Sequence, residues 1–69
     1  MEYIVIYQDN RWDSFFADEF KIEKGKIVFY KGMGEKFFRV SASIKSIDVI
    51  FILEFKNGKF IHIYDAIMD

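Results

Sequence analysis

The sequence predicts a small all-β fold, and its composition is the first reason. Of the 69 residues, 28 are Ile, Val, Phe or Tyr, whereas Leu occurs once and Ala three times. Branched and aromatic side chains suit a pleated, half-buried surface, while Leu and Ala favour helices. The second reason is the placing of the glycines, which divide the chain into short strand-like runs. We expect one domain over residues 1–69, with at most one short helix.

The first half of the chain predicts a strand, an ambiguous segment and a hairpin. Residues 2–8 form the expected first strand, with apolar side chains on both faces. Lys24-Gly25 separates residues 20–23 from residues 26–30, and this arrangement favours a hairpin. Residues 9–19 leave two interpretations open. Trp12 to Phe16 suits a further strand, while Asp13 suits the N-cap of a short helix lying over an apolar sheet face.

The second half contains the strongest local signal. After a turn at Gly32-Met33-Gly34, residues 36–40 are expected to form a strand, and residues 41–46 an irregular or 3₁₀ corner. Asn57-Gly58 then stands between two β runs, and both residues tolerate the positive φ of a type I′ turn. Pairing across this turn predicts four opposed pairs: Phe55 with Phe60, Leu53 with His62, Phe51 with Tyr64, and Val49 with Ala66.

Both faces of this C-terminal ribbon are apolar, whereas a ribbon with one wet face should alternate apolar and polar residues. A large exposed apolar patch on a soluble protein usually marks an interface. We therefore expect a protein interface on the isoleucine side of the ribbon, covered by a second copy in a dimer or by a larger protein partner. Residues 9–19 are the alternative cover. The expected interface residues are Ile50, Ile52, Ile61, Ile63 and Ile67.

Taken together, these elements predict an antiparallel meander of five to six strands that curls into a barrel or half-barrel. This strand pattern resembles the small barrels of the Sm and SH3-like architectures and the bacterial pleckstrin-homology-like (PH-like) architecture. The resemblance covers the strand pattern of the whole chain and includes no diagnostic motif. It implies a fold and no particular function.

Catalytic and metal-binding patterns are weak. The chain has no cysteine and one histidine, His62, which removes disulfides and the usual zinc ligand sets. An acidic cluster surrounds Trp12, but its members alternate with turn residues and lie near cations, so a solvated rim is expected. The four serines lack a second histidine or an oxyanion-loop pattern to activate them. We expect no enzyme activity, no metal and no cofactor.

A second hypothesis is binding of single-stranded nucleic acid. Charge is segregated along the chain: residues 2–19 carry net −4, residues 20–45 net +5 and residues 46–69 net −2, which sum to −1. Aromatic side chains are interleaved with the cations of the basic stretch, as in small β-barrels that stack bases and follow phosphates. The candidate residues are Lys21, Lys26, Tyr30, Lys31, Lys36, Phe38 and Arg39.

The expected location is the cytoplasm. No apolar run approaches the roughly 18–20 residues that span a bilayer, and no basic region precedes an apolar stretch at the start of the sequence. No membrane association is expected. The favoured hypothesis is a non-enzymatic interaction module that self-associates, either as an adaptor or as a small inhibitor of a larger partner.

Overall fold

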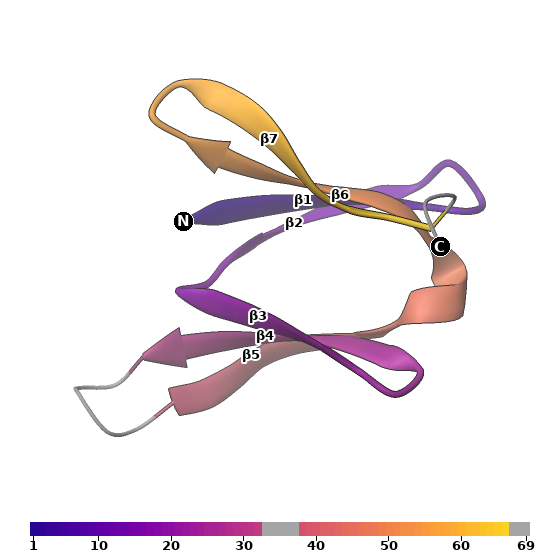
Figure 1. Cartoon of the computed structure of the whole chain (residues 1–69), viewed down its shortest axis with the longest axis horizontal. Helices are drawn as coiled ribbons and strands as arrows, with labels where there is room; N and C mark the ends of the chain where they lie inside the picture. The colour runs from indigo at the N-terminus through magenta and orange to yellow at the C-terminus, as the bar shows by residue number, and fades with distance from the viewer. Residues whose placement is uncertain (33–37, 67–69) are drawn as a thin grey trace.

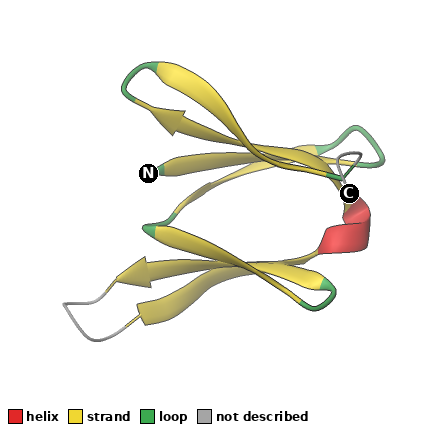
Figure 2. Cartoon of the chain, in the orientation of Figure 1, coloured by secondary structure: helices red, strands yellow, loops and turns green. Residues whose placement is uncertain are grey.

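The computed structural model describes residues 1–32 and 38–66, the side chain of Phe38 excepted. This part of the chain is almost entirely strand, interrupted by one short 3₁₀ turn (Figures 1 and 2). The elements are β1 (Glu2–Tyr7), β2 (Trp12–Phe16), β3 (Glu19–Glu23), β4 (Lys26–Gly32), β5 (Phe38–Lys45), η1 (Ser46–Asp48), β6 (Val49–Lys56) and β7 (Lys59–Asp65). The all-β prediction is confirmed.

The strands form two antiparallel sheets that face one another (Figure 1). The four-stranded sheet has the order β2-β1-β6-β7, and the three-stranded sheet has the order β3-β4-β5. The chain passes between the sheets twice, at the link from β2 to β3 and through η1 between β5 and β6. The described strands form no closed barrel. The barrel and its likeness to Sm, SH3-like and PH-like architectures stay predictions.

Backbone hydrogen bonding continues through the corner between β2 and β3. The Met1 ammonium group donates to the Ala17 carbonyl at 2.9 Å, and the Ala17 N–H donates to the Met1 carbonyl at 3.0 Å. The Asp18 N–H donates to the Tyr30 carbonyl at 2.8 Å, which begins the β3–β4 ladder. Because buried backbone groups need partners, this corner can be buried, and the small side chain of Ala17 lies in the core.

Aromatic rings from both sheets form the centre of the core. Alternation along β1 buries Tyr3 and Val5 between the sheets, and Phe29 of β4 faces them from the other sheet. The Phe29 ring centroid lies 5.1 Å from that of Tyr3 and 5.4 Å from that of Phe15. Aliphatic side chains complete this core: Ile27, Val49 and Ile52. Each large buried side chain contributes about 1.5–3 kcal/mol relative to exposure.

The C-terminal hairpin confirms two predicted pairs and corrects two. Phe55 lies opposite Phe60 and Leu53 opposite His62, while Asn57 and Gly58 have φ values of 52° and 77°. A bulge between Ile52 and Leu53 then shifts the register. Beyond that point the pairs predicted for Phe51 and Val49 are wrong. The observed pairs are Ile52 with Tyr64 and Phe51 with Asp65, and the Ala66 N–H donates to the Ile50 carbonyl.

Three other predictions have clear outcomes. The hairpin at Lys24-Gly25 is confirmed, and residues 12–16 form a strand rather than a helix, so the described residues contain seven strands where five to six were predicted. The corner predicted over 41–46 is wrong for residues 41–45. They continue β5, because Ala42 and Ile44 alternate with serines and pair with the core strand β4. Gly32, the first residue of the turn predicted at 32–34, is the last residue of β4, and the rest of that turn and the start of the 36–40 strand lie outside the described residues.

Candidate functional site: the outer face of the four-stranded sheet

The outer face of the four-stranded sheet is apolar. Since Tyr3 and Val5 point into the core, alternation directs Ile4 and Ile6 to the opposite side of β1. Residues opposite one another in an antiparallel pair share a face, so the register defines the rest of this surface. We call it the aromatic face. It consists of Trp12, Ser14 and Phe16 of β2, Glu2, Ile4 and Ile6 of β1, Phe51, Leu53 and Phe55 of β6, and Phe60, His62 and Asp65 of β7.

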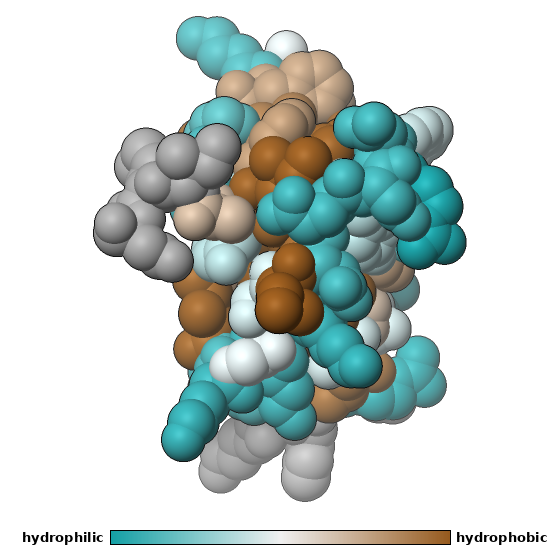
Figure 3. Space-filling view, turned by 90° about the vertical axis from the view of Figure 1, so that its right-hand side faces the viewer, coloured by the Kyte–Doolittle hydropathy of each residue, from teal (hydrophilic) through white to brown (hydrophobic). Residues whose placement is uncertain are grey.

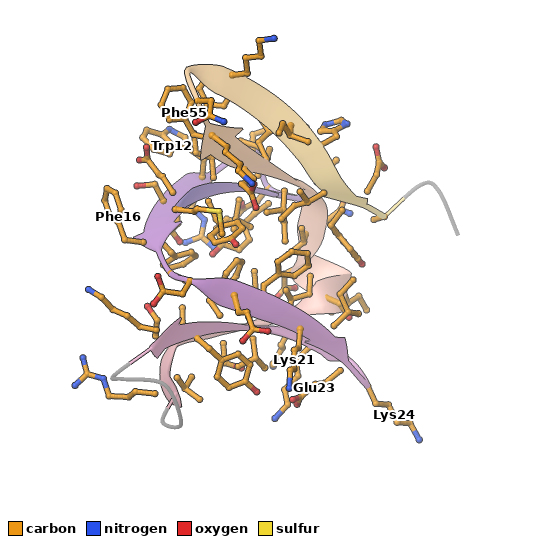
Figure 4. All side chains as sticks on the ribbon, turned by 60° about the vertical axis from the view of Figure 1, so that its left-hand side comes forward. Trp12, Phe16, Lys21, Glu23, Lys24 and Phe55 are labelled. Carbon is orange, nitrogen blue, oxygen red and sulfur yellow. The ribbon has the colours of Figure 1, made fainter. Side chains whose placement is uncertain are left out.

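Four aromatic side chains on this face are exposed to solvent. The exposed fractions are 64% for Trp12, 65% for Phe16, 37% for Phe55 and 58% for Phe60. Figure 4 shows Trp12, Phe16 and Phe55 projecting from the same side of the sheet. At about 200 Å² for each aromatic side chain, the four expose about 450 Å². That area lies within the roughly 300–600 Å² of the largest apolar patch on a typical monomer, a patch that is often functional.

Ring contacts preorganise part of the aromatic face. The ring centroids of Phe55 and Phe60 lie 4.9 Å apart, and those of Phe51 and His62 lie 5.0 Å apart. Both pairs join neighbouring strands β6 and β7, so each ring restricts the motion of the other. Aromatic pairs at such spacings contribute about 0.5–1.5 kcal/mol beyond the burial of their area. The face therefore presents rings held in place rather than loose side chains.

Nothing in the described chain packs over the aromatic face. Residues 12–16 pair with β1 at its edge and extend the sheet, so they do not form the cover that was one expectation for residues 9–19. The three-stranded sheet lies against the opposite side, where the core is formed. Because residues 12–16 widen the sheet by one strand, they also enlarge the side that the described chain leaves uncovered.

The structure places three residues of the predicted isoleucine interface, Ile52, Ile61 and Ile63, on the inner side of the sheet. Ile52 is fully buried, Ile63 is half-buried and packs against the core, and Ile50 is half-buried where a bulge interrupts the β1–β6 register. Ile61 alone among the described members is well exposed, at 45%, beside the hairpin turn. Ile67 lies outside the described residues. The apolar side that is left open is the opposite side of the sheet. In the sequence, the signal for that side was the presence of four aromatic residues, Trp12, Phe16, Phe55 and Phe60.

The basic candidates lie on the three-stranded sheet. The Lys21 ammonium is 5.7 Å from the Tyr30 ring centroid, and Lys26 lies 3.9 Å from the Glu23 carboxylate. The Tyr30 hydroxyl donates to Glu23 at 3.1 Å, and partial burial together with this bond raises the pKa of Tyr30. Figure 4 shows Lys21 and Glu23 close together on β3. This surface therefore mixes both signs of charge.

The remaining basic candidates are at the far end of the same sheet or outside the description. Lys31 lies opposite Arg39 in the β4–β5 ladder, so these two cations are neighbours. Lys36 and the side chain of Phe38 lie outside the described residues. The described part of the predicted nucleic-acid surface thus has two separate cationic regions, one near Lys21 and one at the Lys31–Arg39 pair.

A shallow cleft of about 220 Å³ lies at the turn between β1 and β2, lined by Tyr7, Gln8, Asp9, Arg11 and Asp48. The Arg11 backbone N–H donates to the Asp9 carboxylate at 3.1 Å and the Arg11 guanidinium does so at 2.6 Å; the backbone bond first, and then the guanidinium, keep the pKa of Asp9 below its usual value. The Tyr7 hydroxyl donates to Asp13 at 2.8 Å; burial, then this bond, raise the pKa of Tyr7 to about 12. Hydrophilic and apolar side chains are intermixed at this end of the molecule, which also carries η1 (Figure 3).

Within the cleft, the Arg11 guanidinium and the Asp9 carboxylate form an ion pair. Within residues 1–32 and 38–66, no three His, Cys, Asp or Glu side chains are grouped to hold a metal ion. The same residues contain no helix that is long and apolar enough to cross a membrane. No family model, no curated protein and no solved structure shows a significant match to the chain.

Proposed function

We propose that this chain is a non-enzymatic protein-interaction module and that the aromatic face is its binding surface. The observation that carries the proposal is the exposure of Trp12, Phe16, Phe55 and Phe60 on one side of one sheet. Covering about 450 Å² of apolar surface releases about 11 kcal/mol at about 25 cal/mol per Å², before the costs of association. Association costs roughly 4–15 kcal/mol because the two molecules lose translational and rotational freedom. The free energy of covering the face offsets this cost only when a partner covers most of it.

The shape and composition of the face favour a protein over a small molecule. Small-molecule sites are concave, whereas this surface is the side of a sheet with alternating ridges of side chains. Trp and other aromatic residues are enriched at the centres of protein interfaces, where charged residues are depleted. The carboxylates of the aromatic face, Glu2 and Asp65, belong to different strands and to the first and last of its three cross-strand rows, and Ile4 and Leu53 lie in the middle of the row between them. The apolar centre between them matches that anatomy.

Site-specific photo-crosslinking tests the proposal. We would replace Phe60 or Phe16 by benzoylphenylalanine, irradiate cells that express the chain, and look for covalent adducts with protein. Ile47 is the matched control, because it is 80% exposed on η1 and outside the aromatic face. We expect adducts from both positions on the face and none from position 47. Equal yields from all three positions, or no adduct from the face, would contradict the proposal.

Binding of single-stranded nucleic acid is a second candidate, favoured by the Lys21 cation beside the Tyr30 ring. Cations that follow phosphates and a ring that stacks on a base are the parts that such binding uses. Changing Lys21→Glu together with Lys26→Glu should abolish binding of a labelled oligonucleotide, and affinity of the unmodified protein should fall steeply with salt. Absence of binding at low salt would end this candidate.

A further inference from the structure

We infer that the partner of the aromatic face is a second copy of this chain, packed face to face in a symmetric dimer. The inference rests on the proposed function, since it names the occupant of the same surface. In such a dimer the two four-stranded sheets lie in the middle and the three-stranded sheets lie outside. Packed sheets lie about 10 Å apart, so the four layers form one continuous core.

The area of the face agrees with the needs of a small dimer. The four exposed rings give about 450 Å² on each copy, hence about 900 Å² for the pair. The half-buried Ile4, Ile6, Phe51 and Leu53 between those rings add to this sum. Obligate homodimers bury about 2,000–5,000 Å² in total, whereas a smaller dimer that dissociates on dilution needs about 1,000 Å², with an apolar centre in both cases. A sheet side of apolar residues with rings on β2, β6 and β7 fits that description.

The charges on the face are compatible with self-association. In a two-fold dimer each residue meets the symmetry-related position of its own surface. With the axis along the strands, Glu2 falls over Phe55 of the second copy, because β1 exchanges with β6 in the same row. With the axis across the strands, Glu2 falls over the row of Ile6. With the axis across the strands, the two Glu2 carboxylates lie at opposite ends of the sheet, whereas with the axis along the strands they are offset by only about one strand spacing, ~4.8 Å. The charges therefore favour the arrangement with the axis across the strands.

The composition of the face also selects against a strongly charged partner. Its two acids, Glu2 and Asp65, lie in the first and last cross-strand rows, and the row between them, Ser14, Ile4, Leu53 and His62, contains no Asp, Glu, Lys or Arg. The cations of the chain are concentrated instead on β3 to β5, which stay outside in this dimer. An apolar surface without a charge pattern is best matched by another of the same kind. A second copy supplies that surface at equal concentration.

Trp12 provides a direct reporter, because it is the sole tryptophan of the chain and lies on the aromatic face. We would measure molar mass by light scattering and Trp12 emission over the same series of protein concentrations. We expect the mass to double and the emission to shift to shorter wavelength over one common concentration range. Phe60→Lys and Phe16→Lys change opposite edges of the sheet, and each should raise the dissociation constant at least tenfold. Ile47→Lys should leave it unchanged.

Every outcome decides between the two proposals. A monomer whose Trp12 emission is that of a solvent-exposed indole overturns self-association but leaves the face free for another protein. A monomer with buried Trp12 emission overturns both, because the chain then covers its own face. A dimer that keeps exposed Trp12 emission and ignores both lysine variants uses another surface and overturns this inference. Circular dichroism confirms that each variant is folded, and two independent lysine variants protect the test against one that unfolds.

Discussion

Replacing Phe29 by alanine should remove a large part of the free energy of unfolding. Phe29 is fully buried, and its ring centroid lies 5.1 Å from Tyr3, 5.4 Å from Phe15 and 6.3 Å from Phe20. Truncation of a buried Phe to Ala costs about 3–5 kcal/mol, because transfer energy is lost and a cavity is left among these rings. A domain of this length has a total of roughly 3–10 kcal/mol. We therefore expect Phe29→Ala to be marginally folded or unfolded at 25 °C.

Urea unfolding followed by far-ultraviolet circular dichroism measures this loss. All variants are compared at one protein concentration, since self-association makes apparent stability depend on concentration. Ile47→Ala is the control: it truncates an apolar side chain that is 80% exposed, and should change stability by less than about 0.5 kcal/mol. If Phe29→Ala costs less than about 1 kcal/mol, or no more than Ile47→Ala, the two-sheet core described above is wrong.

Three further changes test other parts of the fold. Burial, and then the Glu54 carboxylate, raise the pKa of Tyr3 from 10.0 to about 12. The contribution of the neutral Tyr3 side chain to the free energy of unfolding is therefore complete below pH 10, and it is lost as the pH rises towards 12. Tyr3→Phe should therefore flatten the alkaline fall in stability by up to about 2.7 kcal/mol, at 1.36 kcal/mol per pKa unit, in urea titrations across that range. Gly58→Ala should cost about 1–2 kcal/mol, because φ is +77° while no atom lies within 4 Å of the added Cβ; a thermal melt shows whether backbone strain alone acts. Ala17→Leu should cost about 1–3 kcal/mol by overpacking the buried corner, and a neutral result in the same melt would show that the corner has room.

Local patterns in the sequence were sufficient for most elements and for part of the pairing. The Asn57-Gly58 turn and the pairs nearest to it follow from turn chemistry, which acts over a few residues. The pairing further along failed at the bulge after Ile52, because an extra residue in one strand changes register without any mark in composition. The ambiguity of residues 12–16 was resolved by pairing with β1, a contact between separate segments of the chain.

The amino-acid pattern alone shows that β1 and the C-terminal ribbon are apolar on both sides, and it predicts a cover for each side. Which side the three-stranded sheet covers became known from the packing of the two sheets. Placing the three-stranded sheet against Tyr3 and Val5 buried the inner isoleucines and left Trp12, Phe16 and Phe60 open. Alternation along a strand assigns residues to two faces, but it does not show which of the two faces packs against the second sheet. The position of the second sheet depends on the two corners, at Ala17 and at η1, where the chain crosses over.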